Sequence, residues 1–169
     1  MQDQEVNIEQ GEVVFEDTTL NREEYPLLFS LKNILDFYFG EISLNTIINF
    51  SAKSHQGFTQ ELAIDVVKEV GLIAVARDMK ASDIPNHFLP CIIFDEKQNP
   101  FVLKRKAKEC FLYDPINNCE IKKDINYLKK FTKAILVFRD PKKEKILDEI
   151  KGKIGFGIRL RNSGVHILK

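Results

Sequence analysis

The chain has no Trp and only three Cys among its 169 residues. The Cys, at positions 91, 110 and 119, are odd in number and lack a Cys-x-x-Cys spacing, so they do not indicate the disulfide framework of a small secreted domain. The N-terminus also lacks a basic start followed by an apolar run. Together these absences predict a reducing, cytoplasmic compartment. No stretch reaches the roughly 18 to 20 uncharged apolar residues that span a bilayer, so we expect any membrane span of a parent protein to lie outside this segment.

Several motifs of nucleotide and metal chemistry are missing as well. The sequence contains no GxxxxGK[ST] phosphate loop, no GxGxxG after a strand and no HExxH. Its three His, at positions 55, 87 and 166, lie far apart, and none stands at metal-ligand spacing from a Cys. The sequence therefore gives no basis for a metal or any other cofactor.

The charges balance overall but are distributed unevenly. Twenty-five basic and twenty-five acidic residues leave a formal net charge of zero, which does not favour a nucleic-acid binder. Residues 1–26 carry eight acidic residues and one Arg, whereas residues 129–169 carry twelve basic and four acidic residues. We expect residues 1–20 to form an acidic extension and residues 140–169 a basic amphipathic connector towards a membrane region outside this chain. A solvated helix face would explain the basic segment equally well.

Apolar residues make up 44% of the chain and include thirteen Phe, enough to build the core of one domain. Between Leu27 and Phe39 they recur every three or four positions, which predicts a helix that ends at Gly40. Two more helices are expected, one over 43–50 with Ser43 as its cap and one that Thr59 caps and Gly71 ends.

After Gly71 the apolar period changes to that of strands, and turn-rich connections between the runs predict antiparallel hairpins. A two-layer α+β domain is therefore expected, with helices first and an antiparallel sheet after them. Shorter elements are also expected: a strand-like run over 13–15, a helical turn over 127–131 and an amphipathic helix over 142–151. The expected strands are Leu72–Arg77, Pro90–Asp95, Phe101–Lys106, Glu109–Tyr113 and Lys133–Arg139.

The run from Leu27 to Gly40 resembles the first helix of the bacteriocin-processing cysteine peptidases, cysteine peptidase family 39, which stand at the N-terminus of peptidase-containing ABC exporters. The resemblance spans about residues 21–138. It implies a papain-like α+β fold over residues 21–139, with N-terminal helices packed on a twisted antiparallel sheet. Further landmarks of the family are similar to Gly57-Phe58-Thr59, Gly71-Leu72, Leu89-Pro90, Pro100-Phe101-Val102-Leu103 and Tyr113-Asp114-Pro115.

Departures from the family pattern fall on the catalytic positions. Leu27 stands where the family places its nucleophilic Cys, and Pro100 where it places the general-base His. Asp114 matches the third member, which orients the His in the family, and Asn21 stands near the Gln that donates to the oxyanion. Neither Leu nor Pro can attack a carbonyl or accept a proton, so hydrolysis by this route is expected to be absent. Asp114 has a second reading as the turn-forming Asp of an Asp-Pro pair.

The resemblance implies an inactive, peptidase-like domain at the N-terminus of a type I secretion ABC exporter. Such a domain docks the unfolded secreted protein on the cytoplasmic side of the inner membrane, beside the transmembrane and nucleotide-binding parts of its own transporter. Substitution of both catalytic residues suggests an apolar substrate-binding groove lined by Leu27, Phe29, Pro100 and Phe101. Alternatively, these side chains fill and close the old cleft.

Two other classes of function remain open from the sequence. The first is an active cysteine peptidase that cleaves double-glycine leader peptides, either by the family route or through a relocated thiol such as Cys119 beside His87. Cys91, inside an apolar strand run, is expected to be a buried small hydrophobe, and Cys110 alternates with Phe111 on a strand. The second is a structural module that only contacts its own transporter.

Overall fold

The computed structural model describes residues 20–51 and 57–143. The strand expected over 13–15 and all but the start of the helix expected over 142–151 lie outside these residues. Three helices come first: α1 (Pro26–Phe39), α2 (Leu44–Ser51) and α3 (Gln60–Glu69). The predicted caps are present, because the hydroxyls of Ser43 and Thr59 accept hydrogen bonds from the backbone N–H of Thr46 and Leu62.

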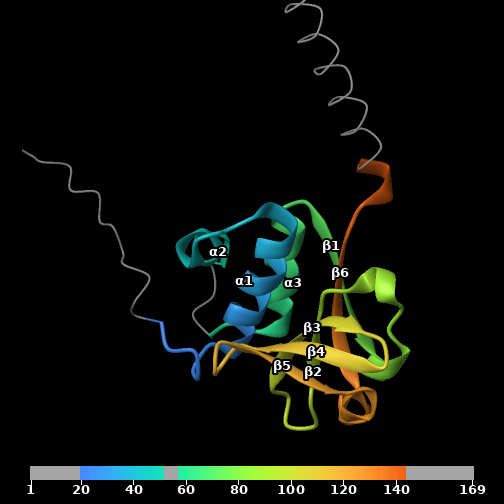
Figure 1. Cartoon of the computed structure of the whole chain (residues 1–169). Coiled ribbons are helices and arrows are strands. Elements are labelled where there is room, and N and C mark those ends of the chain that lie inside the picture. The colour runs from blue at the N-terminus through green and yellow to red at the C-terminus, as the bar shows by residue number, and fades with distance from the viewer. Residues whose placement is uncertain (1–19, 52–56, 144–169) are drawn as a thin grey trace, which may run out of the picture.

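The strands form one antiparallel sheet in the order β1-β6-β2-β3-β4-β5. The sheet twists strongly, so that β1 and β6 run across the direction of β3, β4 and β5, while the three helices gather on one side (Figure 1). The predicted α+β fold, with helices packed on a twisted antiparallel sheet, is confirmed. The strands are β1 (Leu72–Asp78), β2 (Cys91–Phe94), β3 (Pro100–Lys106), β4 (Glu109–Asp114), β5 (Cys119–Asp124) and β6 (Lys133–Arg139).

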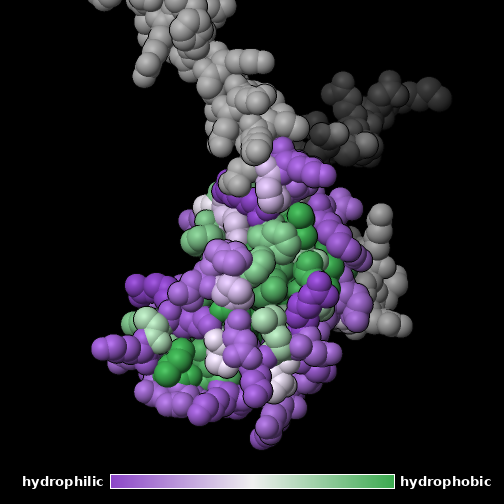
Figure 2. Space-filling view, turned by 90° about the vertical axis from the view of Figure 1, so that its right-hand side faces the viewer, coloured by the Kyte–Doolittle hydropathy of each residue, from purple (hydrophilic) through white to green (hydrophobic). Residues whose placement is uncertain are grey.

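Apolar clusters lie on both faces of the sheet. The first cluster joins α1, α2 and α3 to the sheet, and it includes Leu31 and Ile34 of α1 with Val102 of β3. The second lies on the other face and includes Leu103 and Phe131. It is covered by three short 3-10 helices: η1 (Ala81–Asp83), η2 (Asn86–Phe88) and η3 (Ile125–Lys130). Figure 2 shows the side of the molecule on which η1 and η2 lie, where apolar side chains gather in a central area bordered by hydrophilic ones.

Strand β5 was not expected from the sequence. Its residues Cys-Glu-Ile-Lys-Lys-Asp show no apolar alternation, and five of the six are exposed. The strand exists because β4 pairs with it along its whole length, from Glu109 opposite Asp124 to Asp114 opposite Cys119. Charged side chains on an outermost strand discourage pairing with other chains, so hydrophilic character is compatible with this position. Among the described residues, no helix combines the length and apolar character needed to cross a membrane.

Candidate functional site

Leu27, in the first turn of α1, and Pro100, the first residue of β3, are both buried. Leu27 is 8% exposed and belongs to the cluster between the helices and the sheet. Pro100 begins β3, is buried, and stands two residues before Val102 of the same cluster. Because side chains alternate along a strand, Pro100 and Val102 face the same side of the sheet, the side on which α1 packs against β3. Leu27 and Pro100 are therefore both buried on the α1 side of the sheet.

The prediction that Phe101 lines a groove together with Leu27, Phe29 and Pro100 is wrong. Phe101 is out of phase with Pro100 on β3, and its ring packs on the opposite face of the sheet, 5.6 Å from the Phe131 ring centre in an edge-to-face contact. Phe29 does lie on the α1 side, with Leu27, but is only 5% exposed. Leu27, Phe29 and Pro100 are thus buried on the α1 side of the sheet, while Phe101 packs on the other side. This geometry favours the closed alternative over an open groove.

A side chain that the sequence analysis did not single out covers this region. The guanidinium of Arg22 lies 4.1 Å from the centre of the Phe29 ring. Its Nη1 donates to the hydroxyl of Tyr113, at 2.8 Å, and to the backbone carbonyl of Pro115, at 3.1 Å. Arg22 therefore ties the segment before α1 to the turn between β4 and β5. We call this set of contacts the Arg22 clasp.

Asp114 has its carboxylate occupied by the turn that follows β4. Oδ1 accepts from the backbone N–H groups of Ile116 and Asn117, at 2.9 and 3.2 Å, and Oδ2 accepts from the Asn117 side chain, at 2.7 Å. The carboxyl is buried, with Asp114 8% exposed. These contacts are those of a turn-forming Asp, the second reading of this residue.

Asn21 organises the chain just before α1. Its Oδ1 accepts from the backbone N–H of Glu23, at 3.0 Å, and its carbonyl accepts from those of Glu24 and Tyr25. The residue itself is exposed. The structure thus gives Asn21 a local turn role at the position where the resemblance implied an oxyanion donor.

Comparison with known proteins decides the family. Residues 18–143, well over half of the chain, match the peptidase C39 family. The chain belongs to the peptidase C39 family. No curated protein matches it.

Solved domains of this family share the fold of the C39 chain. The N-terminal peptidase C39-like domain of a toxin secretion ATP-binding protein from Vibrio parahaemolyticus is 21% identical, with a TM-score of 0.58 over 69% of this chain and 98% of that one. A double-glycine-motif protease from an AMS/PCAT transporter, solved with its leader peptide, is 19% identical, with a TM-score of 0.52 over 66% of this chain and 81% of that one. The peptidase domain of Streptococcus ComA, a bi-functional ABC transporter, is 13% identical, with a TM-score of 0.52 over 66% and 88%.

Two of the three thiols of this C39 chain are inaccessible. Cys91 is fully buried in β2, as expected, and burial raises the pKa of its thiol to about 12. Cys110 is also buried, burial raises its pKa, and its Sγ donates to the carbonyl of Asp124. A nucleophilic thiol needs a lowered pKa and access to substrate, and these two have neither. Cys119, at the start of β5, is exposed.

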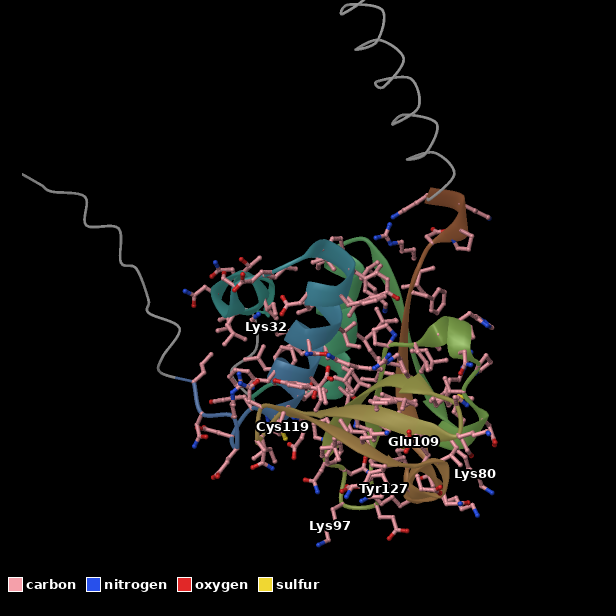
Figure 3. All side chains as sticks on the ribbon, in the orientation of Figure 1. Lys32, Lys80, Lys97, Glu109, Cys119 and Tyr127 are labelled. Atoms are coloured by element: carbon pink, nitrogen blue, oxygen red, sulfur yellow. The ribbon has the colours of Figure 1, made fainter. Side chains whose placement is uncertain are left out.

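The structure does not bring Cys119 and His87 together. His87 belongs to η2, which packs against β6, whereas Cys119 begins β5 at one edge of the sheet. Strands β2, β3 and β4 lie between β6 and β5. At about 4.8 Å for each step between neighbouring strands, the two elements are roughly 19 Å apart. Figure 3 shows Cys119 at the end of the β4–β5 hairpin that lies next to the first turn of α1.

Proposed function

We propose that this C39 chain is a non-hydrolytic docking domain of a type I secretion ABC exporter, which binds the secreted polypeptide without cleaving it. The observation that carries the proposal is the burial of both Leu27 and Pro100, the residues that the resemblance places where the family has its nucleophile and base. A thiolate–imidazole pair would have to stand there for the family's chemistry.

The surroundings of these two residues support the same reading. The Arg22 clasp closes the surface above Phe29, and the carboxylate of Asp114 is held by its own turn. The buried thiols of Cys91 and Cys110 have raised pKa values, and Cys119 has no His on a neighbouring strand. These features argue against the alternative of an active peptidase that cleaves double-glycine leaders.

The solved relatives supply the expected setting. One belongs to a toxin secretion ATP-binding protein and others to ABC transporters that carry a peptidase domain. By extension, the partners of this chain are an unfolded secreted protein and the transmembrane and nucleotide-binding parts of the same transporter. Its place is the cytoplasmic side of the inner membrane.

The test combines binding and cleavage on one sample. The ¹⁵N-labelled chain is titrated with the unfolded polypeptide that the parent transporter exports, and a double-glycine leader peptide is incubated with the same preparation. We expect saturable chemical-shift changes and an intact leader peptide. An unrelated unfolded polypeptide of equal net charge is the control for specificity. Absence of shift changes anywhere, or leader cleavage that iodoacetamide abolishes, would overturn the proposal.

A further inference from the structure

A long hollow runs across the part of the sheet that α1 leaves open. One part, of about 500 Å³, lies between α1 and the strands and is lined by Phe37, Pro90 and Glu120 among others. A second part, of about 420 Å³, is lined by Leu89 and Phe111 among others. The two parts share Lys104 and Arg105 of β3, so they form one continuous surface, which we call the β3 trough.

The β3 trough combines apolar, basic and acidic side chains, the acidic ones being Asp36, Glu109 and Glu120. The guanidinium of Arg105 lies 4.4 Å from the centre of the Phe111 ring, and Lys122 approaches the same ring from β5, at 5.8 Å. Each of the three carboxylates is paired with a lysine: Asp36 with Lys32, Glu120 with Lys104 and Glu109 with Lys122.

Two basic side chains of the trough, Arg105 and Lys106, have no carboxylate partner among the described residues. Within residues 20–51 and 57–143, no carboxylate lies within ion-pair distance of Arg105 or Lys106. Arg105 is exposed and Lys106 donates to the backbone carbonyl of Ser82. The surface is therefore suited to an anionic segment that also carries apolar side chains.

The chain itself contains a segment of this composition. Residues 1–19 carry six acidic and no basic residues. Within them, the apolar run Val13-Val14-Phe15 is flanked by Glu12 on one side and by Glu16 and Asp17 on the other. The distribution of carboxylates around an aromatic run is complementary to basic side chains around Phe111.

The segment is tethered next to the trough. Arg22 bonds the hydroxyl of Tyr113, and Lys104 of the trough lies 5.9 Å from the Tyr113 ring centre. Phe111 is two residues from Tyr113 along β4, a distance of about 7 Å. Phe15 precedes Leu20, where the described part begins, by five residues, which can span at most about 17 Å. Phe15 therefore stands only seven positions before Arg22, which is bonded to β4, the strand that carries Phe111.

We propose that residues 12–17 bind in the β3 trough of their own chain, with the apolar run against Phe111 and the carboxylates facing the basic side chains of β3. A tethered segment acts at an effective concentration on the order of millimolar, so it competes with any acidic polypeptide that approaches this surface. The contact goes beyond the docking function and is tested without any exported substrate, so the failure of one leaves the other standing.

The experiment uses the full chain with one spin label. The label is attached at Ala107→Cys, which lines the trough, after Cys119→Ser removes the exposed native thiol. The control label is attached at Lys97→Cys, on the turn between β2 and β3, where the side chain points away from the body of the molecule (Figure 3). We expect the amide signals of residues 12–17 to be broadened by the label at 107 and not by that at 97.

A variant that reverses one charge tests whether electrostatic attraction holds residues 12–17 in the β3 trough. The variant Arg105→Glu should remove the broadening, and so should salt of about 1 M, where charges are screened beyond about 3 Å. In the unlabelled chain, Glu12→Gln with Glu16→Gln and Asp17→Asn should shift the amides of Arg105 and Phe111, whereas Glu96→Gln on the β2–β3 turn should not. Equal broadening from both labels, broadening that vanishes on dilution, or no effect of Arg105→Glu would overturn the proposal.

Discussion

The guanidinium of Arg22 stacks on the ring of Phe29, 4.1 Å from its centre, and joins it to the turn after β4 through two hydrogen bonds. The three contacts connect residues that are seven to ninety-three positions apart in the sequence. Arg22 therefore contributes to the packing of α1 on the sheet although it precedes the helix.

Arg22→Ala should lower the free energy of unfolding by about 1–3 kcal/mol, because the cation–π contact is lost and the hydroxyl of Tyr113 loses a donor. Urea denaturation followed by circular dichroism measures the loss. Arg77→Ala, at an exposed position of β1, is the matched control and should change stability little. Equal effects of the two variants would contradict the clasp.

Thiol reactivity should separate the three Cys. In the native chain we expect Ellman's reagent to modify Cys119 alone, since Cys91 and Cys110 are fully buried. In denaturant all three should react. Rapid modification of a second thiol in the folded chain would show that the core around β2 or β4 opens more readily than its packing indicates.

Burial of Cys91 also predicts a pH dependence of stability. Its pKa rises from 9.0 to about 12 on folding, so the folded chain holds the thiol proton over a range in which the unfolded chain releases it. The contribution of this thiol is complete below pH 9 and is lost as the pH rises from 9 towards 12, at about 1.4 kcal/mol for each pH unit. Chemical denaturation at pH 8, 9 and 10 measures the slope. Cys91→Ala should make the slope shallower, and an unchanged slope would contradict the assignment.

Restoring the family residues tests whether Leu27 and Pro100 occupy equivalent positions. In Leu27→Cys combined with Pro100→His, the imidazole should lower the pKa of the new thiol and speed its alkylation by iodoacetamide by about tenfold or more. Leu27→Cys alone is the control, and both carry Cys119→Ser to remove the background thiol. Equal alkylation rates would mean that the two side chains do not face one another.

Asp114→Ala should destabilise the chain by about 1–3 kcal/mol, because two backbone N–H groups and the Asn117 amide lose their acceptor. Thermal unfolding measures the loss, and Asp114→Asn, which keeps one acceptor oxygen, should lose less. Binding of the exported polypeptide should be unchanged in both. A change in binding without a change in stability would assign Asp114 to the docking surface.

Most of the fold could be predicted because most helices and strands bury apolar residues that recur at a regular spacing in the sequence. The spacing of Leu31, Ile34 and Leu35 was enough for α1, and alternation was enough for β3 and β6. Strand β5 was missed because it is exposed on both faces and exists through pairing with β4. The 3-10 helices η1 and η2 were missed because a helix of three residues is too short to show a repeating spacing of apolar residues.

The site was predicted less completely. Leu27, Pro100 and Asp114 were named from the resemblance to the family. The position of Phe101 follows from strand alternation, which the groove hypothesis did not apply. Arg22 could not be found, because its partners Tyr113 and Pro115 lie more than ninety positions away and no local pattern links them. The β3 trough depends on where α1 stops covering the sheet, which is a property of packing.

Strands β2 and β3 are enclosed by apolar layers on both sides, and all four residues of β2 are buried. Separation of either layer would expose apolar side chains of β2 and β3 to water, which favours melting of both layers in a single step. Under the docking function proposed above, the domain would then resist a pull on its bound polypeptide as one body, with no partly opened form in between.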